Sequence, residues 1–156
     1  MEGVGRMTLR FRSRSEHMLD DKGRLSIPTR FREVLRETGT ETLVITNWQQ
    51  CLKAFPVSEW ERLEAKLLGE GRSQPGLAEF VRYAISGVSE CPLDKQGRVL
   101  LLPSLRTQFG IEKEVVLNGM LDHFEIWERA AWQQVTQRSL ENFDSYKQGL
   151  SNLGIF

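Results

Sequence analysis

Residues 15–24 read SEHMLDDKGR, and residues 89–98 read SECPLDKQGR. The two stretches share the pattern Ser-Glu-x-x-Leu-Asp-x-x-Gly-Arg, and the second lies 74 residues after the first. A repeat of this kind indicates that the chain is built from two similar units. Because each unit is too small to bury a stable core alone, we expect the two units to complete one core together.

The similarity between the halves continues beyond these ten residues. Leu43-Val44-Ile45 has a counterpart in Val115-Val116-Leu117, at a displacement of 72 residues, and aromatic residues follow at matched positions. The matched aromatic residues are Phe55 and Trp60 in the first half, and Trp127 and Trp132 in the second. We expect them to be buried at equivalent places. Pro103 lies 75 residues after Pro28, one more than the displacement of 74 for the first pattern. This difference predicts a one-residue insertion in the second copy.

Size and composition are those of a soluble globular protein. The chain has 156 residues, 40% of them apolar and 27% charged, enough for one domain with a substantial core or two very small ones. No apolar run approaches the roughly 18 residues that a membrane helix needs. The first ten residues also lack the hydrophobic stretch of a signal peptide. We therefore expect a cytoplasmic protein with no membrane partner.

The residues that usually carry catalysis or bind metals are isolated. Cys51 and Cys91 form no Cys-x-x-Cys motif, which favours buried thiols over a disulfide or a zinc site. His17 and His123 have no second ligand or base at helical or strand spacing. Nucleophile-elbow, Walker, zinc-protease and dinucleotide-binding motifs are all missing from the sequence. The sequence therefore predicts no enzyme, no metal, no cofactor and no small-molecule substrate.

Charge is unevenly distributed along the chain. The totals cancel, with 21 basic and 21 acidic residues, which by itself argues against a nucleic-acid partner. Up to Arg36, however, nine basic residues stand against five acidic ones. An anionic partner responds to such a local surplus within a Debye length of roughly 8–10 Å. Composition alone supports a solvated basic face equally well.

The spacing of apolar residues predicts an α+β chain with the same order of elements in both halves. In the first half we expect strands at 17–19, 24–27, 42–46 and 51–55, a helix from Pro28 to Gly39, and a helix from Ser58 to Gly69. In the second half we expect strands at 98–102, 114–118 and 124–127, a helix from Pro103, and a helix carrying Trp132 and Val135.

Local motifs add detail to this plan. Residues 20–23 have the composition of a hairpin turn. Ser58 and Glu61 match a capping box at a helix start. A further helix carries Leu77, Val81, Ala84 and Ile85 at core spacing. The resulting division is a first repeat over 11–69, a linking loop and helix over 70–86, a second repeat over 87–141, and a loosely ordered tail over 142–156.

The strongest candidates for a functional role are the two Asp-x-x-Gly-Arg turns. We call residues 20–24 the first tip and residues 94–98 the second tip. In each tip the Asp can orient the Arg, whose planar, permanently charged donors suit phosphate oxygens or a guanine edge. The alternative, which spacing alone slightly favours, is that the Asp merely caps the turn and the Arg satisfies it at the surface.

A family resemblance weighs against that alternative. Residues 11–32 read FRSRSEHMLDDKGRLSIPTRFR; together with 52–56, 58–60, 89–100 and 124–127 they closely resemble the MraZ family. That family belongs to the AbrB-like swapped-hairpin group. The chain departs from the family pattern in three places: ten residues precede the usual start, Ser13 and Ser15 replace a glycine and an aromatic residue, and Leu102 replaces the first of two prolines.

The resemblance implies an AbrB-like swapped-hairpin or double-split β-barrel, formed by two internal repeats and flanked by helices. It also implies a nucleoid-associated transcriptional regulator of the bacterial division and cell-wall gene cluster, which binds short direct repeats in double-stranded DNA upstream of its own gene as a cyclic homo-oligomer. The alternative function is a non-catalytic ring-forming scaffold whose basic turns bind an acidic protein.

The residues expected to contact DNA are basic and lie in or near the tips. They are Arg12, Arg14, Lys22, Arg24, Lys95 and Arg98, with Asp20 and Asp94 as orienting residues and Gly23 and Gly97 as turn residues. We expect Arg24 to be the principal contact and Arg98 the secondary one. The reason is that Arg24 follows the basic N-terminal stretch, with Arg12 and Arg14 upstream.

Overall fold

A computed structural model describes residues 7–155, so residues 1–6 of the N-terminal extension and Phe156 lie outside the described part. The first half contains β1 (Arg14–Met18), β2 (Arg24–Ser26), α1 (Thr29–Glu37), β3 (Thr42–Asn47), β4 (Leu52–Pro56), α2 (Val57–Leu68), the 3-10 helix η1 (Glu70–Ser73) and α3 (Leu77–Ser86). The second half contains β5 (Ser89–Pro92), β6 (Arg98–Leu100), α4 (Pro103–Gln108), β7 (Glu114–Gly119), β8 (Phe124–Glu128), α5 (Arg129–Glu141), the 3-10 helix η2 (Phe143–Tyr146) and α6 (Lys147–Asn152).

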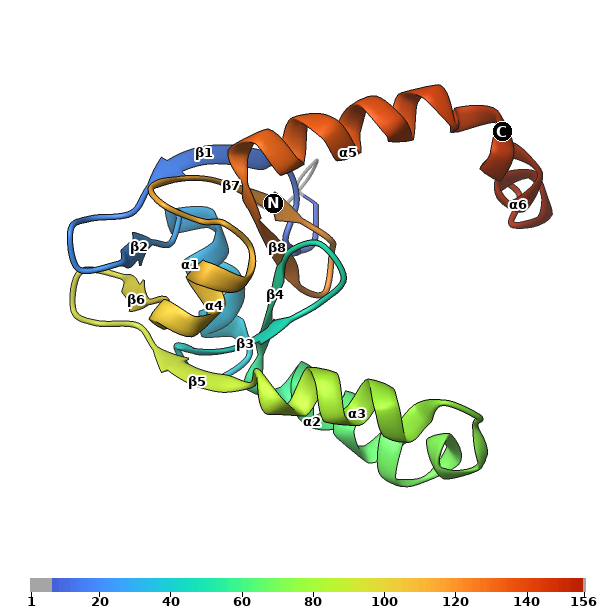
Figure 1. Ribbon diagram of the computed structural model, residues 1–156, viewed down its shortest axis with the longest axis horizontal. Coiled ribbons are helices and arrows are strands. Elements are labelled where there is room, and N and C mark those ends of the chain that lie inside the picture. The colour runs from blue at the N-terminus through green and yellow to red at the C-terminus, as the bar shows by residue number, and fades with distance from the viewer. Residues whose placement is uncertain (1–6, 156) are drawn as a thin grey trace, which may run out of the picture.

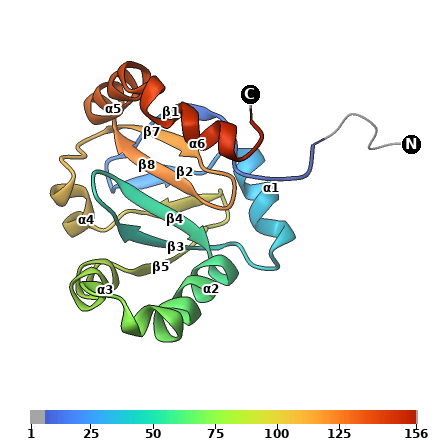
Figure 2. The same ribbon diagram turned by 90° about the vertical axis from the view of Figure 1, so that its right-hand side faces the viewer.

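The fold is the expected α+β arrangement of two swapped repeats. Six strands form an antiparallel sheet in the order β1-β7-β8-β4-β3-β5, and β2 pairs with β6 in a separate two-stranded ribbon. The pairs β1–β7, β4–β8, β3–β5 and β2–β6 each join strands from different halves of the chain, whereas β3–β4 and β7–β8 are hairpins within one half. Helices α1 and α4 lie on opposite sides of the strands (Figures 1 and 2). No helix among residues 7–155 is long and apolar enough to cross a membrane.

The predicted hairpin at 20–23 needs correction. The turn itself forms, with hydrogen bonds from Asp20 N to Arg24 O (3.0 Å) and from Gly23 N to Asp20 O (2.9 Å). Beyond it the strands separate: β1 pairs with β7, and β2 pairs with β6. The residues of a turn determine its local geometry but carry no information about which strands pair further away, so the local pattern could not reveal the exchange.

One hydrophobic core contains residues of both halves. Leu25 in β2 faces Val99 in β6, and their side chains are 0% and 1% exposed. The rings of Phe11, Phe31 and Phe124 pack against one another with centroids 4.9–5.3 Å apart, within the range that aromatic pairs prefer. The largest cluster of buried side chains thus combines both halves, which share one main core.

The matched aromatic residues form two smaller clusters on the other face of the sheet. Phe55 packs on Trp60 with centroids 5.4 Å apart, and Trp127 packs on Trp132 at 6.0 Å. Phe55, Trp60 and Trp127 are buried as expected. Trp132 is only half-buried, so that prediction was wrong for one of the four.

The helices beyond the strands also repeat. The succession α2, η1, α3, here named the first arm, recurs as α5, η2, α6, the second arm. The tail therefore contains a 3-10 turn and a helix, which its weak periodicity did not predict. In the first arm α3 returns to the sheet, where Thr46 Oγ1 donates a hydrogen bond to Ala84 O (2.6 Å). In the second arm α6 stays at the far end of α5, away from the sheet (Figures 1 and 2).

Two details of the helices differ from the sequence predictions. The capping box does not form, because α2 begins at Val57 directly after Pro56, and no side chain caps it. In α5 the equivalent position is Glu128, whose carboxylate accepts hydrogen bonds from two backbone amides. Ile85 is 39% exposed rather than in the core, since α3 buries only Ala84 against the sheet.

We predict that Leu25→Ala lowers the free energy of unfolding of the whole chain by about 2–5 kcal/mol. The matched control is Leu100→Ala in the same ribbon; because Leu100 is 48% exposed, its loss changes stability by only about 0.5 kcal/mol. Chemical denaturation followed by far-ultraviolet and tryptophan signals measures both. Coincident shifts are expected for Leu25→Ala, whereas a change confined to one of two separable transitions would contradict the shared core.

Candidate nucleic-acid interface

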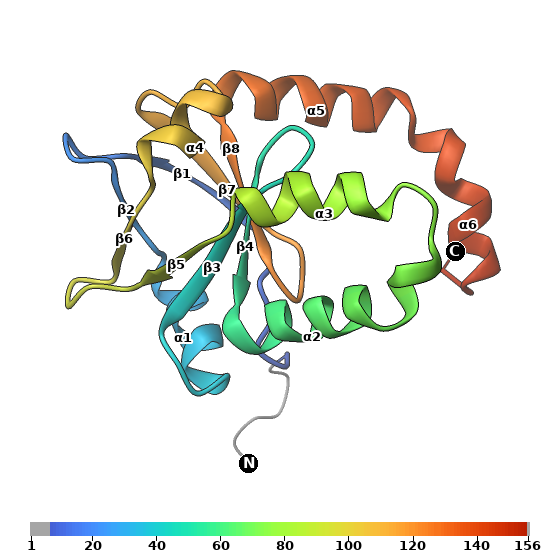
Figure 3. The ribbon, with the colours of Figure 1, turned by 60° about the horizontal axis from the view of Figure 1, so that its bottom comes forward.

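The two tips lie side by side because the ribbon ties them together. At its ends, Ile27 N donates a hydrogen bond to Gly97 O (2.9 Å) and Leu101 N donates one to Gly23 O (3.0 Å). Each tip is therefore hydrogen-bonded to the residue that directly follows the ribbon strand of the other half. Both protrude from the same end of the molecule, opposite the two arms (Figure 3).

Each tip has the same internal hydrogen bonds. In the first tip, Asp20 Oδ1 accepts from the backbone amides of Lys22 (2.9 Å) and Arg24 (2.8 Å), and Asp20 Oδ2 accepts from Arg24 Nε (2.6 Å). In the second tip, Asp94 Oδ1 accepts from the amides of Gln96 and Arg98 (both 2.9 Å), and Asp94 Oδ2 accepts from Arg98 Nε (2.9 Å). Each aspartate therefore caps its turn and also holds its arginine in place.

These hydrogen bonds keep the aspartates ionised. The backbone amide of Arg24, helped by its guanidinium and by the amide of Lys22, lowers the pKa of Asp20 from 3.8 to about 2. The corresponding bonds from Arg98 also lower the pKa of Asp94. Both carboxylates therefore stay charged at neutral pH, and both arginines keep an anionic partner.

The glycines of the tips are required for two reasons. Gly23 and Gly97 have φ angles of +82° and +76°, in the left-handed region that favours glycine. An arginine also lies close to each: a Cβ at Gly23 would be 2.9 Å from Arg106 Cζ, and a Cβ at Gly97 would be 2.8 Å from Arg32 Cδ. Arg106 belongs to α4 and Arg32 to α1, so each helix reaches the tip of the other half.

The sequence pattern did not single out Arg32 and Arg106, because aligning Pro28 with Pro103 places these arginines one residue out of register. The backbone amide of Arg32 bonds to Pro28 O (3.0 Å), and that of Arg106 bonds to Leu102 O (3.1 Å). Leu102 is thus the counterpart of Pro28, and the predicted one-residue insertion is wrong. Matched residues of the two halves are 74 positions apart up to these arginines. From β3 and β7 onward they are 72 positions apart, because α4 is shorter than α1. Extending the displacement of 74 would have paired them.

Four of the basic candidates gather at the tips, and two do not. Arg98 Nη1 lies 3.8 Å from Asp20 Oδ2, which links the second tip to the first. Arg14 begins β1, six residues before Asp20, which at a rise of about 3.3 Å per residue is roughly 20 Å along the strand. This exceeds the Debye length, so Arg12 and Arg14 do not strengthen the field at Arg24 as expected. They line a small depression with Arg30 instead.

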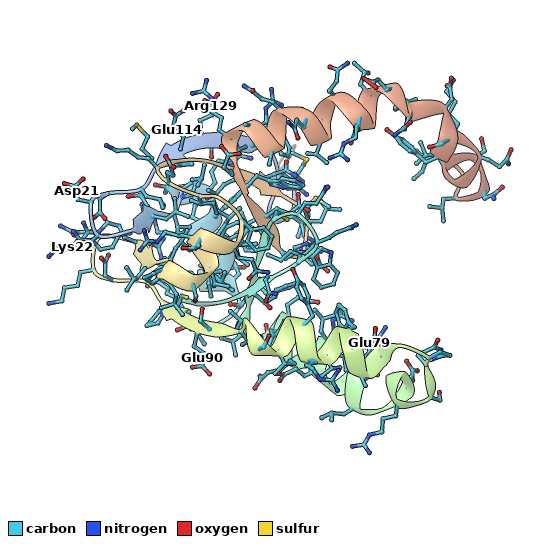
Figure 4. All side chains as sticks on the ribbon, in the orientation of Figure 1. Asp21, Lys22, Glu79, Glu90, Glu114 and Arg129 are labelled. Carbon is cyan, nitrogen blue, oxygen red and sulfur yellow. The ribbon has the colours of Figure 1, made fainter. Side chains whose placement is uncertain are left out.

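The tips and the two helix arginines form a basic surface. It contains Lys22, Arg24, Arg32, Lys95, Arg98 and Arg106 against Asp20, Asp21 and Asp94. Lys22 extends into solvent from the edge of the molecule (Figure 4). Within residues 7–155 no group of three or more His, Cys, Asp or Glu side chains is arranged to hold a metal ion. Cys51 and Cys91 are buried free thiols, as the sequence predicted.

Comparison with known proteins agrees with this two-part architecture. The family model described as "MraZ protein, putative antitoxin-like" matches residues 11–82 and again 84–151, so that each matched segment contains one tip. The chain belongs to the MraZ family.

Relatives within the family match nearly the whole chain. The "Transcriptional regulator MraZ" of Syntrophobacter fumaroxidans is 41% identical over 93% of this chain and 97% of its own length. The protein of the same name from Desulforapulum autotrophicum is 38% identical over 93% of this chain and 99% of its own. That from Shewanella denitrificans is 44% identical over 80% of this chain and 83% of its own.

We predict a pH signature of the first tip. Because the folded-state pKa of Asp20 is lowered, its ionised form stabilises the fold above pH 3.8, and this stabilisation is lost as the pH falls towards 2. The difference in unfolding free energy between the wild type and Asp20→Asn should therefore be constant near neutral pH and shrink between about pH 4 and pH 2. Denaturant titrations at a series of pH values measure it.

Asp21→Asn is the matched control, because it removes a charge from the same turn without removing any of these hydrogen bonds. Its effect should be smaller and should depend less on pH. Identical pH profiles for the two variants would show that the hydrogen bonds do not control the ionisation of Asp20.

Proposed function

We propose that this chain is a transcriptional regulator that binds double-stranded DNA through its two tips. The observation that carries the proposal is the side-by-side placement of two arginines, Arg24 and Arg98, each held by an aspartate on a protruding turn. The relatives' name, transcriptional regulator, supports the same function. No catalytic step, cofactor or small-molecule substrate forms part of the proposal.

The chemistry of the tips suits DNA. A guanidinium held at Nε keeps its outer nitrogens free to donate two parallel hydrogen bonds to guanine O6 and N7 or to a phosphate. Holding the side chain in advance reduces the conformational entropy that binding would otherwise cost. Lys22 and Lys95 add mobile charges for the neighbouring phosphates. The major groove is wide enough to admit a two-stranded β-ribbon, and β2 and β6 with their tips form such an element.

The expected target and location follow from the family resemblance. We propose short direct repeats in the promoter upstream of the chain's own gene, within the division and cell-wall gene cluster, and a cytoplasmic, nucleoid-associated protein. Two tips give a single chain few phosphate contacts, and weak sites gain affinity when several are linked at a fixed spacing. A cyclic homo-oligomer would meet several direct repeats at once.

Two different apolar surfaces support such an assembly. The second arm exposes large apolar side chains, with Leu140 at 71% and Leu153 at 76%. The first arm contains a groove of about 410 Å³ lined mainly by Trp48, Trp60, Leu63, Leu67 and Phe80. Contact between unlike surfaces on successive copies is heterologous and closes into a ring when the rotation allows. We therefore propose that the second arm of one copy docks against the first arm of the next.

We predict that Arg24→Ala and Arg98→Ala each weaken binding to the promoter fragment by about 1–3 kcal/mol. Similar losses are expected, because the two tips have the same hydrogen bonds and Arg12 and Arg14 are distant from both. Fluorescence anisotropy with labelled promoter DNA measures the affinities. Arg62→Ala, on α2 and paired with Glu59, is the control and should bind normally.

If folded, oligomeric Arg24→Ala and Arg98→Ala proteins both keep full affinity, the tips are structural turns. A salt-independent affinity of the wild type for DNA would also contradict the proposal, since phosphate contacts displace counterions. Binding to an acidic protein without binding to DNA would favour the scaffold alternative.

We predict that the double change Leu140→Ser and Leu153→Ser converts the oligomer to smaller species, because it removes two exposed apolar side chains from the second arm. Light scattering coupled to size-exclusion chromatography measures the mass. Met18→Ser, which alters a 61% exposed side chain at the opposite end of the molecule, should leave the mass unchanged. A wild type that is monomeric at micromolar concentration and still binds the promoter fully would refute the ring.

A further inference from the structure

The arginines of the tips differ from the helix arginines beside them in how their charge is balanced. Arg24 and Arg98 are each paired with an aspartate of their own turn. Among the described residues, Arg32 and Arg106 form no ion pair with any carboxylate. Arg32 donates from Nε to Ile27 O (3.1 Å) and from Nη2 to Thr29 Oγ1 (3.0 Å), and Arg106 donates from Nε to Leu101 O (3.1 Å).

The helix arginines are therefore anchored but not neutralised. Carbonyl and hydroxyl acceptors orient a guanidinium without cancelling its charge. Arg32 Nη1 and both Nη atoms of Arg106 have no acceptor among residues 7–155, although both side chains are half-buried and lie against the glycines of the tips. Donors fixed in this way are suited to an external anion with several oxygen atoms.

We propose that Arg32 and Arg106 form a phosphate-binding pair, one at each tip, that supplies much of the attraction for the DNA backbone. This inference rests on the proposed function. A neutral pair such as Arg24 with Asp20 provides directed donors but little net field, which suits discrimination between bases. A half-buried, uncompensated arginine is screened less than an exposed lysine and suits a phosphate.

The two halves depend on each other in this arrangement. Arg106 of the second half lies at Gly23 of the first tip, and Arg32 of the first half lies at Gly97 of the second tip. At each tip, the proposed site therefore combines an arginine paired with an aspartate, from one half, with a helix arginine that has no carboxylate partner among the described residues, from the other half. A single repeat separated from its partner would present an incomplete site.

The experiment measures binding of the full-length protein, in its native oligomeric state, to the promoter fragment and to an unrelated duplex of equal length over a series of salt concentrations. Arg32→Gln and Arg106→Gln should each weaken binding to both duplexes alike. Each should also reduce the slope of log affinity against log salt by about 1 for every copy of the chain that contacts the DNA. Arg32→Lys and Arg106→Lys retain the charge and should retain the slope.

Arg82→Gln on α3 is the control for loss of an exposed arginine elsewhere, and its slope should match that of the wild type. A purely structural role, in which the guanidinium only supports the glycine turn, predicts lower melting temperatures and an unchanged slope for the Gln and Lys variants alike. That result would overturn the inference while leaving the proposed function intact. A wild type that binds neither duplex would instead refute the proposed function.

A second measurement covers the case of Gln variants that do not fold. In the unaltered protein, the Nε–Hε NMR signals of Arg32 and Arg106 should shift when the unrelated duplex is added, because phosphate contacts do not depend on sequence. Unchanged signals for both arginines in a sample that binds this duplex would overturn the inference.

Discussion

The pairing of β2 with β6 is the constraint on which the rest of the structure depends. These two short strands come from different halves, and their hydrogen bonds place Leu25 against Val99 at the centre of one core. In the same exchange β1 pairs with β7, β5 pairs with β3, and β4 pairs with β8, so that strands of both halves also make up the large sheet. Loss of this pairing would expose Leu25 and Val99 and release the hydrogen bonds that hold the tips together.

The proposed function depends on the same exchange. Two turns that each present one held arginine become a single surface only because the ribbon fixes their spacing. The exchange also brings the helix of each half over the tip of the other, which explains why Gly23 and Gly97 must lack a side chain. The arginines of the tips and of the two helices thus lie together at one end of the molecule, while the two arms extend from the opposite end (Figures 3 and 4).

Much of this could be predicted from the sequence. The repeated tips, the order of elements and the burial of Phe55, Trp60 and Trp127 follow from periodicity and turn chemistry, which are local signals. Strand partners are non-local, so the sequence pattern at 20–23 suggested an ordinary hairpin. Arg32 and Arg106 were missed because proline is common at helix starts, and aligning Pro28 with Pro103 shifted the comparison by one residue. The tail lacked periodicity because α6 buries no residue.

The central claim is that the paired tips are the surface that meets DNA. Site-directed cross-linking tests it most directly, with a photoreactive group attached at Lys22→Cys, at Lys95→Cys and, as a control on the first arm, at Glu79→Cys (Figure 4). The native thiols should not interfere, because Cys51 and Cys91 are buried and burial raises the pKa of Cys51 to about 12. We predict cross-links to promoter DNA from both tips and none from Glu79→Cys. Cross-links from the arm with none from either tip would contradict the account.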